Sequence, residues 1–278
     1  MSLPEYLYKY RPVNAMTLMS LLNTYNWFSK PSSFNDPFDC HIKISNKKIS
    51  FKEYMDRYIH STYNKIPVDG EVYKIAFPKG SVSKDEFTDD FHNLIDNFRE
   101  HLEFDVKNRF ILSLSENFDN TTMWSHYSDN HTGICLEFSP KELIKNDKPE
   151  DFYIKVEYKK PNKIDFNAYN LFAYCENNQN IDKYKQIIDE IVSTKSDDWA
   201  YEAEWRVVHN REGAMGYYQH ALTGVYFGLR CGVEEKRAIR NILANVRMSF
   251  FQMVRSENQF GLDALPMTKE SEFWHTMP

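Results

Sequence analysis

The sequence predicts an α+β fold, with a mixed, mostly antiparallel sheet and helices packed around it. Strand-like segments recur along most of the chain, and helical periodicities occur between them without the regular alternation of a doubly wound parallel sheet. The 278 residues are 42% hydrophobic and 15% aromatic, which suffices for a large core. Only 9 Gly and 11 Pro are present, so the composition excludes a disordered or repeat-turn protein.

The N-terminal segments predict a strand, a helix and a second strand. Leu7–Arg11 alternates in character and is stopped by Pro12. Asn14 can cap a helix over Ala15–Tyr25, and Asn26–Ser29 follows as a short strand. The apolar face of that helix would consist of Met16, Leu18, Met19, Leu21 and Leu22.

The domain organisation is predicted to be simple. A single domain over residues 1–267 contains a helical insertion at about residues 49–105. Within the insertion, polar helices are expected at about residues 51–61 and 84–103. Residues 268–278 form a polar tail that we expect to be loosely held.

The second half of the chain supplies most of the predicted strands. They are Arg109–Ser115, Thr132–Phe138, Phe152–Tyr158, Ala203–His209, Thr223–Phe227 and Phe250–Val254. Helices are predicted at Ile181–Thr194 and Val233–Leu243. Several strands with helices interspersed favour the α+β class over a parallel sheet.

Charge and cysteine content narrow the function classes. The net charge is −6 and no block of like charge occurs, which argues against nucleic acid as the main partner. Four widely spaced cysteines, without a CxxC pair, predict free thiols rather than a zinc site. No apolar leader or membrane-length run is present, so we expect a cytoplasmic protein without membrane contact.

An Asn-Asp-Pro turn between two Phe residues is the first candidate site. Asn35, Asp36 and Asp39 lie in a segment whose turn chemistry is strong and whose Phe residues favour burial. These polar groups could form a pocket wall and bind a ribose hydroxyl. The alternative is a structural turn in which one Asp acts as a cap. His41–Ser45, which follows, is expected to be extended.

The first strand ends in two cations beside an aromatic residue. Lys9, Tyr10 and Arg11 could grip a phosphate or carboxylate, since the guanidinium offers a bidentate fork. An edge strand with solvated cations is the alternative.

A polar loop is expected in the middle of the chain, and it includes an aromatic cluster. His126 and Tyr127, next to Trp124, could stack on a ring or bond to it. His126, Asp129 and His131 lack the spacing that places two His on one helical face, so no metal is expected there.

Two acids flank an alanine before the strand that carries Arg206. On a strand, Glu204 and Arg206 share one face, so the carboxylate would stay ionised and fixed. A fixed carboxylate suits stabilisation of a cationic transition state. The alternatives are a surface ion pair, worth under ~1 kcal/mol, or a catalytic Glu202 instead of Glu204.

A competing arrangement resembles that of metal-dependent nucleases. Glu137 on one strand and Glu157 with Lys159 on the next could hold a divalent ion and a phosphate. Such short patterns also arise by chance on solvated strand faces.

Taken in order, these segments resemble the bacterial family catalogued as domain of unknown function number 2971. The resemblance covers roughly Tyr8 to Gly228. It is carried by Lys9-Tyr10-Arg11, Trp27-Phe28-Ser29, Phe34 to Asp39, Ser113-Leu114-Ser115, Met123 to Tyr127 with His131 and Gly133, and Lys195 with Trp199 to Arg206.

A weaker resemblance is to ADP-ribosyltransferase-like folds, which carry an Arg, a Ser and a Glu on successive strands. It implies that Arg11 holds the NAD pyrophosphate or ribose and that Ser29 supports the nicotinamide ribose. Tyr10 or Tyr127 would stack on the nicotinamide, beside Asn35 or Asp36. Glu204 would stabilise the oxocarbenium-like state. The chain departs from the pattern because it lacks a clear Ser-Thr-Ser strand.

The predicted function is therefore an NAD-dependent ADP-ribosyltransferase-like enzyme, acting as a toxin or phage-defence effector. The substrate is a small-molecule nucleotide, and no metal is expected. The predicted catalytic residues are Glu204, Arg11 and Tyr10. The predicted NAD-binding residues are Lys9, Ser29, Asn35, Asp36, Asp39, Trp124, His126, Tyr127, Glu202 and Arg206. The alternatives are a metal-dependent nuclease and a non-enzymatic nucleotide sensor.

Overall fold

The computed structural model describes residues 2–40, 44–45, 47–53, 81–83, 86–144, 152–160, 168, 171–172 and 181–276. The chain divides into two compact units. The first comprises residues 1–30, 110–158 and 197–278, and the second comprises residues 31–109 and 159–196. The predicted single domain is thus resolved into two units. The helical insertion predicted at about residues 49–105 falls inside the second one.

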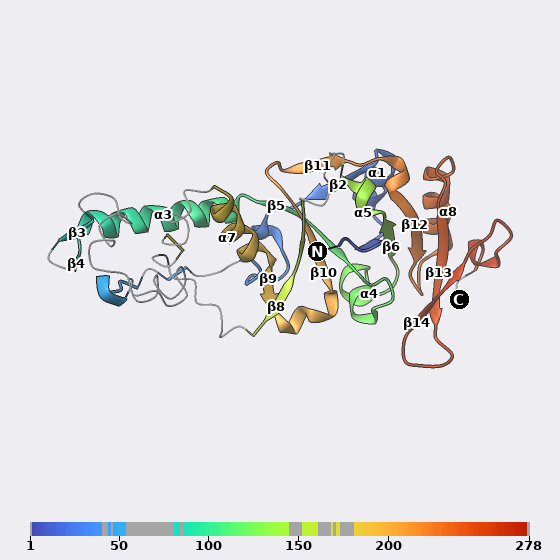
Figure 1. Cartoon of the computed structure of the whole chain (residues 1–278). Helices are drawn as coiled ribbons and strands as arrows, with labels where there is room; N and C mark the ends of the chain where they lie inside the picture. The colour runs from blue at the N-terminus through green and yellow to red at the C-terminus, as the bar shows by residue number, and fades with distance from the viewer. Residues whose placement is uncertain are drawn as a thin grey trace. The chain divides into compact units, whose positions relative to one another are not determined.

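An eight-stranded sheet forms the framework of the first unit (Figure 1). Its strands, in spatial order, are β14 (Leu262–Pro266), β13 (Ser249–Arg255), β12 (Leu222–Phe227), β6 (Ile134–Phe138), β1 (Leu7–Arg11), β5 (Phe110–Ser115), β10 (Glu204–His209) and β7 (Tyr153–Lys155). All neighbours are antiparallel except β12 and β13, which are parallel and lie on either side of helix α8 (Val233–Ile242) in the chain. The predicted α+β class with a mixed, mostly antiparallel sheet is confirmed.

The sheet has two buried faces with different coverings. On one face, Leu7 and Trp205 pack with residues of α1 (Ala15–Leu22), α5 (Pro140–Leu143) and α8. We call this the α1 face. On the other face, Tyr8, Tyr10 and Tyr226 pack with residues of α4 (Thr121–Tyr127). We call this the α4 face. Where the pairing is regular, alternation along a strand therefore assigns its side chains to one face or the other.

Helix α1 begins where the sequence predicts but uses a narrower apolar face. The Asn14 side chain accepts a hydrogen bond from the Thr17 amide at 2.9 Å, which caps the first turn. Leu21 is buried, but Met16, Met19 and Leu22 are exposed. The predicted apolar face was therefore wrong at these three positions. Its span was also too long, since the helix ends at Leu22 and β2 (Tyr25–Phe28) follows.

Two strand predictions differ from the structure. β2 pairs antiparallel with β11 (Gly213–Gly216), a strand that was not predicted, and the two form a separate ribbon. Residues 152–158 were predicted as one strand. The structure has β7 and then β8 (Glu157–Lys159), separated by Val156, whose amide donates to the Glu204 carbonyl at 2.9 Å.

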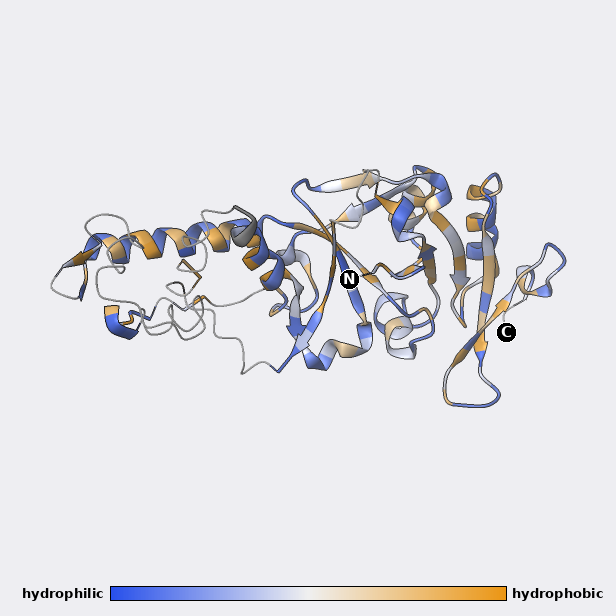
Figure 2. Cartoon of the chain, in the orientation of Figure 1, coloured by the Kyte–Doolittle hydropathy of each residue, from blue (hydrophilic) through white to orange (hydrophobic). Residues whose placement is uncertain are grey.

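The second unit contains two longer helices and short strands. Its elements are η1 (Pro31–Ser33), β3 (Val82–Ser83), β4 (Glu86–Phe87), α3 (Asp89–Lys107), α7 (Ile181–Ser193) and β9 (Thr194–Ser196). Hydrophobic and hydrophilic residues alternate along α3 (Figure 2), and Phe91, Ile95 and Leu102 are buried. The Tyr184 hydroxyl of α7 donates to Asp105 of α3 at 2.9 Å.

The start of α3 corrects a predicted boundary. The helix was expected from residue 84, but it begins at Asp89, because the Thr88 hydroxyl accepts from the Phe91 amide at 3.4 Å and caps it there. Residues 51–53 are helical, and the rest of the helix predicted at 51–61 lies outside the described residues. The same is true of residues 41–43 in the segment that was expected to be extended.

The C-terminal segment is anchored rather than loose. Short turns η6 (Gln219–Ala221) and η7 (Glu272–Trp274) complete the first unit. Trp274 is buried and its indole N–H donates to the Thr268 carbonyl at 2.8 Å. The buried Lys236 ammonium donates to the carbonyls of Phe273 and Thr276. The prediction of a loosely held tail was wrong because Trp274 packs into the core.

The structure also bears on the predictions of free thiols and of a chain without membrane-spanning segments. Cys40, Cys135 and Cys231 are buried free thiols, and Cys175 lies outside the described residues. Within the part of the chain that the structure describes, no helix has the length and apolar character needed to cross a membrane.

Candidate functional site

Helix α4 brings three of the predicted site residues into the first unit. The segment was expected to be a loop, but the Asn120 carboxamide accepts from the amides of Thr122 and Met123 and caps a helix. The Asn120 amide group also donates to the Tyr201 carbonyl at 3.1 Å. One side chain thus starts α4 and ties it to the turn that precedes β10.

Two aromatic residues that were predicted to contact the ligand, Trp124 and Tyr10, pack in the hydrophobic core. Trp124 is fully buried, and its indole N–H donates to the Phe118 carbonyl at 2.7 Å. Tyr10 is buried beside it, with ring centroids 5.3 Å apart, and its hydroxyl donates to the Asn117 carbonyl. We therefore correct their assignment from ligand contact to packing, because both rings pack in the core and the polar group of each donates to a backbone carbonyl.

The two acids before β10 lie on different elements. Glu202 ends the turn η5 (Asp197–Glu202), whereas Glu204 begins β10. Between them Ala203 has a φ of +44°, a left-handed conformation that is uncommon for a residue with a Cβ. Such strain often accompanies functional sites, where the surrounding structure holds the chain in place. Here it separates two carboxylates that are both buried.

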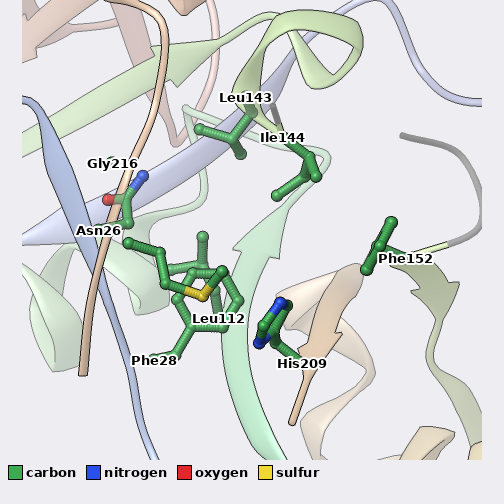
Figure 3. Close-up of a pocket in the computed structure, with 9 residues that line it drawn as sticks. Asn26, Phe28, Leu112, Leu143, Ile144, Phe152, His209 and Gly216 are labelled. Atoms are coloured by element: carbon green, nitrogen blue, oxygen red, sulfur yellow. The ribbon is translucent and has the colours of Figure 1, made fainter. Parts of the chain in front are cut away.

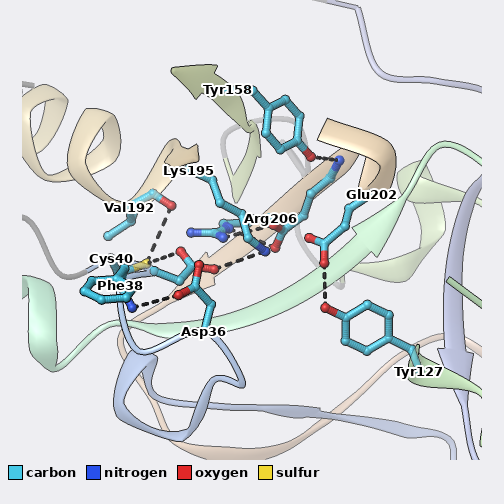
Figure 4. Close-up of polar contacts among 11 residues, drawn as sticks. Asp36, Phe38, Cys40, Tyr127, Tyr158, Val192, Lys195, Glu202 and Arg206 are labelled. Carbon is cyan, nitrogen blue, oxygen red and sulfur yellow. Dashed lines mark hydrogen bonds and ion pairs between the residues drawn. The ribbon is translucent and has the colours of Figure 1, made fainter. Parts of the chain in front are cut away.

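Glu202 is held by the α4 face of the unit. The Tyr127 hydroxyl donates to Glu202 Oε1 at 2.5 Å (Figure 4). The Ser115 hydroxyl donates to the Glu202 carbonyl at 2.7 Å. A carboxylate that receives a short hydrogen bond from a phenol is held in a fixed orientation.

Glu204 forms a buried ion pair with Arg206. The guanidinium donates from Nε and Nη2 to the two carboxylate oxygens, each at 2.9 Å. Both side chains are almost completely buried, so the predicted shared face is confirmed and the surface-pair alternative was wrong. The Glu204 amide donates to the Tyr158 hydroxyl at 2.8 Å. Because both oxygens of Glu204 are bound by Arg206, its role is to fix the local structure.

Partly exposed aromatic rings lie next to Glu202. His126 Nδ1 and the Tyr201 hydroxyl are 3.2 Å apart, and the two ring centroids are separated by 6.1 Å. Trp199 follows at 6.0 Å from Tyr201. We call His126, Tyr127, Trp199, Tyr201 and Glu202 the α4–η5 cluster. Its rings offer a stacking surface beside an oriented carboxylate, which suits recognition of a planar base.

Arg11 does not belong to this cluster. It lies two residues beyond Lys9 and four beyond Leu7 on β1, and therefore on the α1 face. Its Nη1 is 3.5 Å from the Ser20 hydroxyl of α1. Glu204 is opposite Ser115, which is opposite Tyr8, so Glu204 lies on the α4 face. The predicted pairing of Arg11 with Glu204 in one catalytic site was wrong, since the sheet separates them.

Lys9 and Ser29 have structural partners. The Lys9 ammonium donates to the Ser113 carbonyl at 2.7 Å. The backbone of Ser29 exchanges hydrogen bonds with Ile111 at 3.0 and 2.9 Å. Both residues thus join neighbouring segments of the first unit, and neither is part of the α4–η5 cluster.

The Asn-Asp-Pro turn belongs to the second unit. Asp36 Oδ1 accepts from the Phe38 amide at 2.9 Å, and this bond closes the turn (Figure 4). Asp39 pairs with the Lys195 ammonium at 3.2 Å, and both side chains are buried. Asn35 is exposed. The expected burial of Phe38 was wrong, because 79% of it is exposed. The structural alternative therefore holds for Asp36.

Another buried carboxylate on the α4 face, Glu137, accepts hydrogen bonds from hydroxyl groups that the sequence alone does not connect with it. Glu137 Oε2 accepts from the hydroxyls of Tyr226 at 2.7 Å and Tyr8 at 3.3 Å. Thr223 donates to Oε1 at 2.8 Å. Burial and the neighbouring Glu137 carboxylate raise the pKa of Tyr8, and both causes act on the pKa of Tyr226 too.

The arrangement expected for a nuclease is not formed. Glu137 lies on β6, which is separated from β7 by β1, β5 and β10, and Glu157 lies on β8, outside this sheet. The two acids are not on neighbouring strands, as the prediction requires. Among the described residues, no group of three or more His, Cys, Asp or Glu side chains is arranged to hold a metal ion.

Comparison with known proteins gives a family match over part of the chain. Neither curated proteins nor solved structures gave a match to the chain. Residues 123–207 match the model of a family described as protein of unknown function (DUF2971). This stretch includes Tyr127, Glu202 and the Glu204–Arg206 pair. The resemblance to the DUF2971 family that the sequence predicts is thereby confirmed over residues 123–207.

Proposed function

We propose that the protein binds NAD at the α4–η5 cluster and breaks its bond to nicotinamide, with Glu202 as the catalytic carboxylate. The observation that supports this most is the buried Glu202, held by a 2.5 Å hydrogen bond from Tyr127 beside partly exposed rings. In this proposal Glu202 replaces Glu204 as the catalytic carboxylate, because Arg206 binds both oxygens of Glu204. Arg11 and Tyr10 have no part in it.

The chemistry assigns one task to each group. The C1′–N bond of the nicotinamide ribose breaks, and its electron pair remains on the nicotinamide nitrogen. The Glu202 carboxylate stabilises the positive charge that develops on the ribose, as carboxylates do in glycoside hydrolysis. Water or an acceptor hydroxyl then attacks C1′ and releases one proton. His126, Tyr201 and Trp199 supply surfaces on which the nicotinamide or adenine ring stacks.

The test is nicotinamide release from NAD by the purified protein. Glu202→Gln keeps the shape but removes the charge, and we expect release to fall by about 10²- to 10³-fold. Tyr127→Phe removes the orienting hydroxyl and should lower release by a smaller factor. Glu142→Gln, in an exposed pair with His220, is the matched control and should retain full release. Full release by Glu202→Gln would contradict the proposal.

A second candidate function, a nucleotide sensor without turnover, is favoured by Arg11. No carboxylate of the described residues pairs with Arg11, and its Nε is buried without a hydrogen-bond partner. Burial lowers the pKa of its guanidinium. A cation in this state would gain from a phosphate of a bound nucleotide.

The two candidates can be separated because the residues lie on opposite faces of the sheet. A sensor at Arg11 predicts that ADP-ribose raises the unfolding temperature of the wild-type protein and of Glu202→Gln, but not of Arg11→Met. The enzyme predicts that ADP-ribose raises the unfolding temperature of Arg11→Met as much as that of the wild-type protein. If no variant and no wild-type sample responds to ADP-ribose or NAD, both candidates are rejected.

A further inference from the structure

A small apolar pocket lies on the α1 face of the first unit, away from the α4–η5 cluster. It has a volume of about 120 Å³. Most of its wall is apolar and comes from the sheet, the β2–β11 ribbon and the end of α5. The lining residues are Asn26, Phe28, Leu112, Leu143, Ile144, Phe152, His209, Met215 and Gly216 (Figure 3).

The Asn26 side chain gives this pocket an unmet hydrogen-bond donor. Asn26 lies on β2, opposite Met215 of β11, and only 3% of it is exposed. Its Nδ2 is buried and has no hydrogen-bond partner among the described residues. Buried donors without a partner are rare in folded proteins and call for an explanation. A bound molecule with an acceptor atom would supply one.

His209 provides a second donor in the same wall. Its Nδ1 accepts from the Arg211 amide at 3.0 Å, so the proton of the neutral ring resides on Nε2. Burial and the nearby Arg211 lower the pKa of His209, which favours the neutral ring at neutral pH. The ring is stacked on Phe152 at 6.2 Å and meets the edge of Phe28 at 6.3 Å. It is therefore held in a fixed orientation within the wall.

We propose that this pocket binds a neutral, planar, single-ring molecule that carries a carbonyl group. A cavity of ~150 Å³ with an apolar lining accommodates benzene, so the volume here fits one ring. Among the residues that the structure describes, no Asp, Glu, Lys or Arg lines the pocket, so the wall suits a neutral ligand better than a charged one, which would be buried without a counter-ion. The Asn26 amide donates to the carbonyl oxygen, and the His209 ring is the second donor.

The experiment uses two probes of similar shape. Acetophenone carries the carbonyl acceptor, and ethylbenzene lacks it. Binding of each to the full chain is followed by NMR titration. We expect acetophenone to bind more tightly, and Asn26→Leu to weaken its binding about tenfold without weakening that of ethylbenzene. Equal affinity of the wild-type protein and Asn26→Leu for acetophenone would overturn the assignment of Asn26 as the donor.

Two further measurements separate a loss of probe binding from a defect in folding. Asn26→Leu removes a buried donor that has no acceptor and fills a similar volume. The unfolding temperature of the protein without a probe should therefore rise. A lower unfolding temperature would mean that Asn26 Nδ2 already has a hydrogen-bond partner. Met215→Trp places a large ring in the pocket and should abolish binding of both probes while the fold is retained. Binding of either probe to a folded Met215→Trp variant would show that the probe occupies another place.

Discussion

The Glu204–Arg206 ion pair is the strongest constraint at the scale of single residues. Two 2.9 Å hydrogen bonds join side chains that are almost fully buried. A buried pair adds little net stability compared with apolar groups, but removal of one partner leaves a charge without compensation. The pair therefore fixes the conformation of β10 just after the strained Ala203, and with it the position of Glu202.

Arg206→Met should destabilise the first unit by about 3–5 kcal/mol, because it removes the cation that pairs with the buried Glu204 carboxylate. Urea unfolding followed by tryptophan fluorescence measures this. The double variant Glu204→Leu with Arg206→Met removes both charges and should recover much of the loss. If the double variant is less stable than Arg206→Met alone, the cost arises from lost packing instead of the loss of the cation.

The raised pKa of Tyr217 predicts that the folded protein loses stability in alkaline solution. Burial raises its pKa from the ordinary value of 10.0 to about 12, although Arg11 acts in the opposite direction. The folded state thus keeps a proton that the unfolded state loses above pH 10, so this contribution is complete below pH 10 and is lost as the pH rises towards 12. Urea unfolding between about pH 9 and about pH 11 should show the decline. Tyr217→Phe should show a shallower one.

Sequence periodicity predicted some of these residue positions and missed others for a definable reason. The shared face of Glu204 and Arg206 follows from the two-residue repeat of a strand. That Arg11 faces the opposite side depends on the pairing of Tyr8 with Ser115 and of Ser115 with Glu204. This register arises from long-range contacts, so no single strand reveals it. The left-handed Ala203 is also invisible in the sequence, since it is not a glycine.

At the scale of elements, the loop after α4 has an unusual backbone. Asp129, Asn130 and His131 have φ values of 48°, 53° and 71°, so three successive residues are left-handed. The loop is tied to the loop that follows β12 by hydrogen bonds from Gly228 N to Gly133 O and from Arg230 N to His131 O, both at 2.9 Å. The backbones approach so closely that side chains are excluded at both glycines.

Gly228→Ala should therefore destabilise the protein by about 1–3 kcal/mol, because overpacking forces the backbone to move. An added Cβ would lie 2.2 Å from the His131 carbonyl oxygen, which is backbone and cannot rotate away. Thermal unfolding measures the change. Gly261→Ala is the control, because its Cβ would meet nothing closer than a Gln259 side-chain atom at 3.7 Å. Equal effects of the two substitutions would contradict the close-approach argument.

A comparison of predicted and observed boundaries shows which helices and strands can be recognised from the sequence. Strands β1, β5, β6 and β12 were predicted within two residues of each end, because their apolar runs are bounded by turn residues. Helix α4 was missed although its Asn120 cap is visible, since seven residues are too few for a clear helical period. β14 was missed because Leu262–Pro266 has few β-branched or aromatic residues and ends in Pro.

At the scale of the whole molecule, both compact units are discontinuous in sequence. The sheet of the first unit takes β1 from residues 1–30, β5 to β7 from 110–158 and the remaining strands from 197–278. β1 pairs antiparallel with both β5 and β6 in the middle of the sheet. The N-terminal strand is therefore a central structural element, and the three segments depend on one another.

A chain that begins at Asn14 lacks β1 and should not fold its first unit, because β5 and β6 lose their shared partner. Near-ultraviolet circular dichroism should show that the aromatic residues of the α4 face are no longer packed. A chain that begins at Glu5 keeps β1 whole and is the matched control, which should fold. A native near-ultraviolet spectrum from the shorter chain would mean that the sheet closes without β1.

The central place of β1 has a consequence for the way this protein is made. Tyr8 and its hydrogen-bond acceptor Glu137 are 129 residues apart, so the strand leaves the ribosome long before its partner is synthesised. At synthesis rates of about 5–20 residues per second, the delay is on the order of ten seconds. Until β5 is synthesised, Leu7, Tyr8 and Tyr10 have neither of their two partner strands. We therefore expect the nascent chain to expose this apolar segment until its partner strands are synthesised and the sheet can close.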